Sequence, residues 1–325
     1  MRFIHNTNTD PAFNLACEEW LLKNSPDDVF MLWRNAPAVI VGRNQNTLSQ
    51  IDEEFVRTRD IPVIRRLSGG GAVFHDLGNI NFTFIDLKHS GSGLDFRRFT
   101  EPILDALRGM GVPCDFDGRN DLVINGQKFS GNAQHIHKNR VLHHGTLLFS
   151  AEITDLSGAL RVDPEKYRDK AVKSVQKRVT NISSHLPEPM DVAQFLDRLM
   201  GHISSGTAQG GLELSEMEKL AVDSLADVKY RTWDWNFGYS PQYGMVRKTR
   251  TTGGLLEVHL DVKQGRIEQI RLFGDYFGSR NVGELEKRLQ GCRHERTALR
   301  KLIASVPLAD YLRDVQPEEL LNCLF

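Results

Sequence analysis

The sequence predicts an α+β fold with a mixed or antiparallel sheet, whose strands lie before and after one helix along the chain. Short apolar runs of strand length lie on both sides of an amphipathic helical stretch at residues 96–110. An Asn-Gly pair at residues 125–126 separates two of these runs, which is typical of a tight hairpin between antiparallel strands. Strands grouped on both sides of one helix, rather than alternating with helices, favour α+β over α/β.

The N-terminal elements begin with a capped helix. Asp10 followed by Pro11 is a favourable cap and first-turn pair, and apolar residues then recur on one helical face up to Leu21. Apolar runs bounded by turn residues predict several strands after this helix, with one short helix between them. The predicted strands are residues 29–33, 38–42, 63–66, 72–75 and 79–86, and the short helix is residues 52–59.

The central helix and a second group of strands follow. Residues 96–110 carry apolar side chains at helical spacing, and Gly111 with Pro113 ends that helix. The next strands are predicted at residues 121–124, 127–137 and 141–150. Beyond residue 150 the pattern becomes helical and polar, and residues 204–211 are small and flexible enough to form a loop.

A domain boundary is predicted near residue 245, with a catalytic domain at residues 1–245 and an accessory domain at residues 246–325. An aromatic cluster just before the boundary is expected to close the first domain rather than to stack a base: Trp233, Trp235 and Phe237. After the boundary, a hairpin at residues 255–262 and 267–273 precedes amphipathic helices, which predicts a small α+β unit.

The composition describes a folded protein without a bulk charge. A chain of 325 residues with 40% apolar residues can fill one large domain, or a large and a small one. Its 41 basic and 42 acidic side chains leave no net field to attract nucleic acid or an anionic membrane, so neither partner is expected. No leader or membrane span is recognisable, so a cytoplasmic location is expected. Four cysteines without metal-ligand spacing also suit a reducing compartment: Cys17, Cys114, Cys292 and Cys323.

The segment most informative about function is residues 65–76, which reads Arg-Arg-Leu-Ser-Gly-Gly-Gly-Ala-Val-Phe-His-Asp. Glycines remove the side chains that would hold a phosphate away, so backbone N–H groups and guanidinium groups can converge on an anion. The run falls between predicted strands, and no Gly-Lys-Ser/Thr is present, which disfavours Rossmann and P-loop folds. A plain hairpin corner explains the same pattern, so this segment alone leaves a phosphate site and a turn as alternatives.

Lys128 and Asp121 are the charged residues that a phosphate site would use. A lone lysine on a strand is usually solvated, but in a cleft lined by Arg66 and residues 69–71 its point charge could contact two anions. Asp121 could hold a magnesium ion beside a phosphate, or it could cap a turn. Three histidines are expected to bond nearby backbone rather than to act as acids, bases or metal ligands: His75, His143 and His144.

Several motifs, in one order along the chain, closely resemble the lipoate–protein ligase A family. They are residues 65–76 with Leu77-Gly-Asn, Gly118-Arg-Asn-Asp-Leu-Val, Lys128, Ser130-Gly and His143-His-Gly-Thr-Leu-Leu. Supporting matches are Phe13-Asn-Leu-Ala, Glu18-Glu19, Leu32-Trp-Arg-Asn, Gly42-Arg43, Gln45-Asn46 and residues 233–238. The likeness continues in Leu255-Glu-Val-His-Leu-Asp-Val and Arg288-Leu-Gln-Gly-Cys, so it covers nearly the whole chain.

The resemblance implies a catalytic domain akin to biotin protein ligase and class II aminoacyl-tRNA synthetases, with a small accessory domain that moves during the cycle. It also implies a reaction in two steps. ATP and lipoate, with Mg²⁺, give lipoyl-adenylate and pyrophosphate, and the ε-amine of an acceptor lysine then displaces AMP. The implied acceptors are the lipoyl domains of 2-oxoacid dehydrogenase E2 subunits and the glycine-cleavage H protein.

The resemblance also implies roles for individual residues. The positions that match nucleotide contacts are Arg66, Gly71, Ala72, Val73, Phe74 and Lys128. Lys128 also matches the contact to the lipoate carboxylate and is the expected catalytic residue, Gly70 and His75 are expected beside lipoate, and Asp121 is the candidate magnesium ligand. The family's Arg-Arg-Ser-Ser reads Arg-Arg-Leu-Ser here, so Leu67 lacks one possible hydroxyl contact.

Simple electrostatics agrees with this assignment. A carboxylate and a phosphate about 4 Å apart repel by roughly 4 kcal/mol at an effective dielectric constant near 20, and a cation such as Lys128 between them reverses the sign. One rival is an octanoyl or lipoyl transferase that works through a cysteine thioester, but no cysteine lies between Cys114 and Cys292. A non-catalytic binder of lipoyl groups or nucleotide is the other rival. Biotin ligation is a weaker alternative, because the glycine segment does not match its phosphate loop.

Overall fold

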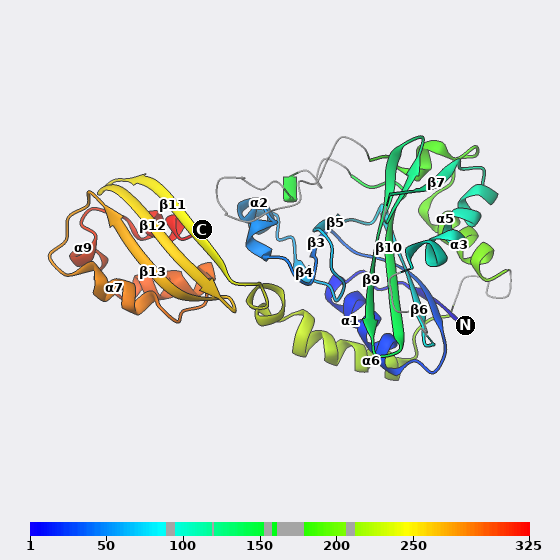
Figure 1. Cartoon of the computed structure of the whole chain (residues 1–325), viewed down its shortest axis with the longest axis horizontal. Coiled ribbons are helices and arrows are strands. Elements are labelled where there is room, and N and C mark those ends of the chain that lie inside the picture. The colour runs from blue at the N-terminus through cyan, green and yellow to red at the C-terminus, as the bar shows by residue number, and fades with distance from the viewer. Residues whose placement is uncertain (89–94, 119, 153–157, 161–178, 206–211) are drawn as a thin grey trace. The chain divides into compact units, whose positions relative to one another are not determined.

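The computed structural model describes residues 1–88, 95–118, 120–152, 158–160, 179–205 and 212–325. These residues form two compact units (Figure 1). The described residues of the first unit fall within residues 1–43, 51–160 and 179–232, and those of the second are residues 44–50 and 233–325. Within these ranges, no helix combines the length and the apolar character needed to cross a lipid bilayer. Residues 153–157 and 161–178 of the helical pattern predicted after residue 150, and residues 206–211 of the predicted loop, lie outside the described residues. The described remainder of that pattern contains helix α5 (Val192–Ile203).

A seven-stranded mixed sheet organises the first unit. Its strand order is β1-β2-β6-β10-β9-β8-β7, and only the β1–β2 pair is parallel. The strands are β1 (Arg2–Asn6), β2 (Val29–Arg34), β6 (Asn79–Asp86), β7 (Cys114–Asp117), β8 (Asp121–Ile124), β9 (Gln127–His137) and β10 (Arg140–Leu148). The turn between β8 and β9 has positive φ at both Asn125 (51°) and Gly126 (75°), as the predicted Asn-Gly hairpin requires.

The two faces of this sheet differ in chemistry. Side chains alternate between faces along each strand, so consecutive residues of β6 divide between them. One face is apolar and packs against α3 (Phe96–Gly109) and α5 (Val192–Ile203) (Figure 1). Helix α1 (Pro11–Asn24) contacts β6 and β10 on the other face, which we call the polar face. The β6 residues in the apolar core are Ile80, Phe82 and Phe84, and those on the polar face are Asn79, Asn81 and Thr83.

A small three-stranded sheet carries the glycine segment. Its central strand β3 (Ala38–Val41) pairs in parallel with β4 (Val63–Arg65) and antiparallel with β5 (Val73–His75). Residues 66–72 therefore connect the two edge strands, on a turn between strands as predicted. The short helix α2 (Glu53–Thr58) also begins as expected, because the Asp52 side chain accepts a hydrogen bond from the Phe55 N–H group.

Helices α6 (Glu216–Leu225) and the π-helix η4 (Ala226–Tyr230) complete the described part of the first unit, after the 3₁₀ turn η3 (Ile182–His185). In the second unit, β11 (Tyr243–Thr251), β12 (Gly254–Lys263) and β13 (Arg266–Gly274) form an antiparallel meander. Four helices bury one face of this meander: α7 (Val282–Leu289), α8 (Arg296–Ala304), α9 (Leu308–Tyr311) and α10 (Pro317–Cys323). The second unit also includes the 3₁₀ turn η1 (Thr47–Ser49) and the π-helix η5 (Asp234–Gly238).

The aromatic cluster before residue 245 does not lie where the sequence predicts. Trp233, Trp235 and Phe237 belong to the second unit, so they do not close the first one. Trp233 stacks on Phe237 with 6.2 Å between ring centroids, and the Arg293 guanidinium lies 5.1 Å from the Trp233 ring. A side chain at Gly265, in the β12–β13 turn, would come within 2.5 Å of the Trp233 ring. The units divide between residues 232 and 233, ahead of the expected boundary near residue 245.

Candidate active site

The glycine segment presents exposed backbone at its tip. Gly70 and Gly71 are exposed, and an added Cβ at Gly69 or Gly71 would meet no atom within 4 Å. Gly70 has a φ of 96°, which a residue with a side chain rarely adopts. Within the described part of the chain, the N–H groups of these three glycines donate no hydrogen bond. The tip is therefore a set of backbone donors open to an anion.

The two arginines hold this segment from beneath. Arg66 is only 7% exposed, and its Nη2 donates to the carbonyl oxygens of Gly69 (2.7 Å) and Gly71 (2.8 Å). Its Nε donates to Ser68 Oγ at 3.1 Å and its Nη1 to Ile40 O at 3.2 Å. Burial lowers the pKa of Arg66 to about 10, which leaves the guanidinium protonated at neutral pH.

Arg65 has a similar structural role. It is fully buried, and its Nη1 donates to the carbonyl oxygens of Gly42 (3.0 Å) and Arg43 (2.9 Å). Both guanidinium groups thus bond backbone carbonyls, whereas the sequence analysis expected them to converge on the anion. Leu67 is 9% exposed and lies in the interior, so an apolar residue suits its position.

Lys128 and Asp121 lie together on the polar face. Lys128 Nζ is 2.7 Å from Asp121 Oδ1, and the two side chains are 41% and 36% exposed. Strand register places Lys128 opposite Val123, beside a register shift between Leu122 and Val123. Such an irregularity turns a side chain relative to the regular alternation and is common next to active sites. Among the described residues, no hydrogen bond or ion pair joins Lys128 to the glycine segment.

The remaining nucleotide positions lie where the segment enters β5. Ala72 and Val73 are half-buried beside the exposed glycines, and Val73 pairs with Ile40 in the small sheet. Phe74 is 5% exposed, so its side chain belongs to the interior.

His75 is a buried neutral histidine with a free ring nitrogen. Burial, with the nearby charge of Arg66, lowers the pKa of His75 to about 3. Its Nδ1 lies 3.0 Å from Asn35 Nδ2. Its Nε2 has no hydrogen-bond partner among the described residues, and the same holds for Asn79 Oδ1 and Asn81 Nδ2 nearby along the chain. Buried polar atoms of this kind suit a site that receives a polar ligand or bound water.

His143 and His144 point to opposite faces of β10. The His143 ring stacks between Phe82 and Phe99 in the apolar core, and its Nδ1 lies 2.9 Å from Gln134 Nε2. His144 lies on the polar face, with its ring nitrogens on the side chains of Ser68 and Glu18. The expectation that these rings and His75 bond nearby backbone is therefore wrong: side chains bond both rings and His75 Nδ1, and His75 Nε2 has no partner among the described residues.

The described residues contain no group of three or more histidine, cysteine or carboxylate side chains arranged to hold a metal ion. Asp121 offers one carboxylate, and Asp117 lies directly opposite it in the β7–β8 ladder. Magnesium commonly binds through one or two carboxylates together with substrate phosphates, so this pair fits such an ion when a phosphate is present.

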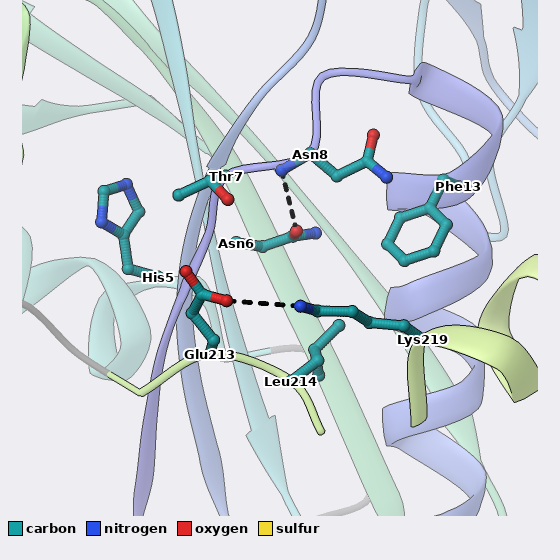
Figure 2. A pocket seen from close by; sticks show the side chains of 8 residues that line it. All are labelled: His5, Asn6, Thr7, Asn8, Phe13, Glu213, Leu214 and Lys219. Carbon is teal, nitrogen blue, oxygen red and sulfur yellow. Dashed lines mark hydrogen bonds and ion pairs between the residues drawn. The ribbon is translucent and has the colours of Figure 1, made fainter. Parts of the chain in front are cut away.

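A pocket of about 270 Å³ opens elsewhere in the first unit (Figure 2). The end of β1, the start of α1 and residues 213–219 form it, and Lys219 Nζ bonds Glu213 Oε2 at 3.3 Å. Its lining residues are His5, Asn6, Thr7, Asn8, Phe13, Glu213, Leu214 and Lys219, none of which the sequence analysis singled out as a site residue.

The chain matches two family models. Residues 10–204 match the lipoyl protein ligase A/B catalytic domain, and residues 240–324 match the bacterial lipoate protein ligase C-terminus. A bi-partite lipoate protein ligase of Thermoplasma acidophilum, described together with its E2 lipoyl domain, has a similar structure. It shows a TM-score of 0.62 and 27% identity over 74% of this chain and 97% of that chain. LipL1 of P. falciparum in complex with lipoate shares the fold, with a TM-score of 0.62 and 24% identity over 99% of this chain and 97% of that chain.

Curated relatives match over the full length. Lipoate–protein ligase 1 of Staphylococcus aureus is 39% identical over 327 residues, and lipoate-protein ligase LplJ of Bacillus subtilis is 39% identical over 331 residues. Each match covers 100% of this chain and 100% of the relative. Because the catalytic model spans more than half of the chain and these relatives match it from end to end, the chain belongs to the lipoate–protein ligase family.

Proposed function

We propose that this lipoate–protein ligase activates lipoate with ATP at the Gly69–Gly71 segment and Lys128, and then transfers the lipoyl group to a lysine of an acceptor protein. The observation that carries the proposal is the run of three glycines whose N–H groups donate no hydrogen bond within the described part of the chain, held in place by the buried Arg66. Preorganised backbone donors stabilise charge that builds on a phosphate, because they need no rearrangement at the moment of reaction.

In the first step a lipoate carboxylate oxygen forms a bond to the α-phosphorus of ATP, and the bond from that phosphorus to pyrophosphate breaks. Lys128 lies between the two anions and offsets their repulsion, which is roughly 4 kcal/mol for charges about 4 Å apart at an effective dielectric constant near 20. Lys128 is paired with Asp121, but both groups are partly exposed, and pairs of this kind typically contribute only about 0–1 kcal/mol. The ammonium group can therefore leave Asp121 for the substrates at little energetic cost.

Arg66, Ala72, Val73 and Phe74 form the protein side of the nucleotide site. Arg66 acts through the segment, because its donors already bind the carbonyls of Gly69, Gly71 and Ile40. Gly70 and His75 lie on the lipoate side, where the unpartnered His75 Nε2 can bond a polar group. Asp121, with Asp117 opposite, would hold magnesium, and the ion would supply positive charge to the departing pyrophosphate.

In the second step the ε-amine of the acceptor lysine attacks the lipoyl carbonyl carbon, and AMP leaves. The acceptors are lipoyl domains of 2-oxoacid dehydrogenase E2 subunits and the glycine-cleavage H protein. The Thermoplasma relative, described with its E2 lipoyl domain, supports the first of these. A cytoplasmic location, where such acceptors are made, remains our expectation.

A reaction through a cysteine thioester has less support. Burial raises the pKa of the Cys17 thiol, and burial also raises the pKa of Cys114 to about 11. Thiols that stay protonated at neutral pH are poor nucleophiles. In the proposed route the acyl-adenylate, rather than an enzyme thioester, carries the activated group.

The test is ATP–pyrophosphate exchange measured in parallel with lipoate, octanoate and biotin. We expect exchange with lipoate, and the octanoate assay measures how narrow the acyl specificity is. Lys128→Ala should lower exchange by about 10²-fold, as loss of one preorganised donor does elsewhere. Lys88→Ala, which removes an exposed lysine after β6, is the matched control and should exchange at the wild-type rate. Near-normal exchange in Lys128→Ala would refute the role of Lys128, and exchange with biotin alone would refute the substrate.

A further inference from the structure

A buried hydrogen-bond chain connects helix α1 to the glycine segment. His144 Nε2 lies 2.6 Å from Ser68 Oγ, and His144 Nδ1 lies 3.0 Å from both carboxylate oxygens of Glu18. Ser68 Oγ also accepts from Arg66 Nε at 3.1 Å. Glu18 is 2% exposed, Ser68 1% and His144 8%, so solvent does not compete for these bonds. The chain thus runs from Glu18 through His144 and Ser68 to Arg66.

The donors and acceptors of this hydrogen-bond chain fit one order when Glu18 is a carboxylate and the His144 ring is neutral. A carboxylate only accepts, so His144 Nδ1 carries the hydrogen that points to Glu18. In the neutral ring Nε2 then accepts from the Ser68 hydroxyl, which leaves the Ser68 oxygen to accept from Arg66 Nε. Thr83 Oγ1 donates a further bond of 2.6 Å to Glu18 Oε1, and Trp33 Nε1 donates to Thr83 at 2.9 Å. Every polar atom in the chain has a partner of the right kind.

We infer that Glu18 is a positioning residue, which fixes the ATP-binding conformation of the Gly69–Gly71 segment through His144, Ser68 and Arg66. The inference rests on the proposed function, because it assumes that this segment binds the nucleotide. Helix α1 supplies a rigid base, and the chain transmits its position to the two carbonyls that Arg66 holds. Groups one step removed from the ligand set the geometry of those that touch it.

The buried charge of Glu18 supports this role. A buried carboxylate requires strong hydrogen bonds or a compensating cation. Glu18 acts on Arg66 from a distance, since its negative charge opposes the lowering of the Arg66 pKa by burial. The charge therefore also helps to keep the guanidinium protonated and bonded to the segment.

The order serine, histidine, carboxylate also occurs in hydrolytic triads. Here Ser68 is 1% exposed and its oxygen already accepts from Arg66, so a substrate carbonyl cannot reach it. A serine nucleophile would react with a fluorophosphonate probe. We expect no labelling of the wild-type protein, and labelling that Ser68→Ala abolishes would overturn the positioning role.

The main test compares Glu18→Gln with its neighbour Glu19→Gln in the full-length protein. Both replace a buried carboxylate of α1 with an amide of similar size, but Glu19 bonds Lys23, Lys229 and Tyr230 rather than His144. Glu18→Gln should raise the KM for ATP in pyrophosphate exchange by about 10-fold, the usual lower limit for losing an outer positioning partner. The KM for lipoate should rise less than the KM for ATP, because Gly70 is the only residue of the segment on the lipoate side. Glu19→Gln should lower the thermal unfolding midpoint without changing the KM for ATP.

Ser68→Ala interrupts the hydrogen-bond chain at a second position. It breaks the link to Arg66 while leaving Glu18 and His144 bonded to each other. The double variant Glu18→Gln/Ser68→Ala should raise the KM for ATP no further than the worse single variant, because both changes break one path. Fully multiplicative effects, or a wild-type KM for ATP in both single variants, would overturn the inference.

The variant Gly71→Val distinguishes failure of this inference from failure of the proposed ATP site. If Gly71→Val weakens ATP binding while Glu18→Gln and Ser68→Ala do not, the segment binds ATP and the positioning chain is wrong. If Gly71→Val binds ATP as tightly as the wild type, the proposed nucleotide site is itself wrong, and the inference falls with it.

Discussion

Two glycines near the arginines are needed for different reasons, one for ligand binding and the other for close packing of the backbone. A Cβ at Gly71 would meet nothing within 4 Å, whereas a Cβ at Gly42 would lie 2.1 Å from the carbonyl oxygen of Gly70. Gly71 leaves space for a ligand, while Gly42 lets two backbone segments approach each other.

We expect Gly71→Val to weaken ATP binding by about 10²-fold, because its side chain would stand between the backbone donors and the phosphate. The free energy of unfolding should stay close to that of the wild type. Gly42→Ala should instead lower it by about 1–3 kcal/mol, as overpacking does in close-packed interiors. ATP titration calorimetry and urea unfolding of both variants measure the two effects. A destabilised Gly71→Val with normal ATP affinity would contradict the assignment.

The buried histidines predict a definite dependence of stability on pH. Burial lowers the pKa of His143 to about 3, against about 6.5 for a histidine in an unfolded chain. The unfolded state therefore binds more protons between these values, and stability falls as the pH drops from about 6.5 toward 3.

His143→Gln should make this dependence shallower. Each such histidine changes the free energy of unfolding by about 1.4 kcal/mol per pH unit between its two pKa values. The wild type should therefore lose about that much more stability per pH unit than the variant. Urea unfolding at pH 7, 6 and 5 measures both slopes. Parallel stability curves for the two proteins would show that His143 is not held neutral.

Single residues of the site were partly predictable. The run of glycines after Arg66 predicts an exposed turn, and the turn lies between strands as expected. The bonds of Arg66 to carbonyls could not be predicted, because they depend on how the segment closes on itself. The chain from Glu18 to Ser68 was also missed, since His144 is 126 residues from Glu18 and 76 from Ser68. Local patterns carry no information about contacts at such separations.

At the scale of elements, α1 is joined to helix η4 by a cluster of charges around the buried carboxylate of Glu19. Glu19 is 3% exposed and accepts bonds of 2.6 Å from Lys23 Nζ, Lys229 Nζ and the Tyr230 hydroxyl. Burial alone would raise the pKa of Glu19, but the hydrogen bonds from Lys229, Lys23 and Tyr230 outweigh it and lower the pKa to about 2. The cluster fastens helix η4, which precedes the division between the units, to α1.

Glu19→Gln should lower the free energy of unfolding at pH 7 by about 3 kcal/mol, the usual effect of removing one partner of a buried charge pair. The folded-state pKa lies below the unfolded value, so this contribution is present above about pH 4.5 and is lost as the pH falls toward 2. The difference between the two proteins should therefore shrink at pH 3. Urea unfolding at both pH values measures it, and a difference independent of pH would argue against a charge effect.

The predicted elements agree well with those observed where the local signal is strong. Helix α3 begins at Phe96, where the Asp95 side chain caps it, and β6 spans residues 79–86 as predicted. Strands β1, β7 and β11 were not predicted, and for β7 and β11 the reason is their charge. Half of β7 is aspartate, and β11 carries Arg247, Lys248 and Arg250 on an edge of its sheet. Charged edge strands lack the apolar alternation that identifies a strand, although they protect a sheet from pairing with other chains.

At the scale of the whole molecule, the described part of the second unit comes from two separate parts of the chain. Residues 44–50 belong to it together with residues 233–325, and Leu48 packs against its apolar core. Thr47 Oγ1 donates a 2.6 Å bond to the carbonyl oxygen of Asn236, and the Thr47 N–H group donates to Ser240 Oγ at 3.2 Å. No sequence pattern reveals this arrangement, because residues 44–50 lie within the stretch that reads as the catalytic domain.

A substitution near the N-terminus should therefore change the stability of the C-terminal unit. Thr47→Val keeps the shape of the side chain but removes the donor to Asn236, and loss of one hydrogen bond costs about 0.5–1.5 kcal/mol. Hydrogen exchange followed by mass spectrometry on the full-length protein should show faster exchange in residues 233–240 and β11, with β6 and β10 unchanged. Thr100→Val is the matched control, because the Thr100 hydroxyl is buried and bonds Phe96 O within α3. Thr100→Val should speed exchange in α3 and leave exchange in the second unit as in the wild type. Wild-type exchange in residues 233–240 and β11 of Thr47→Val would show that residues 44–50 do not stabilise the C-terminal unit.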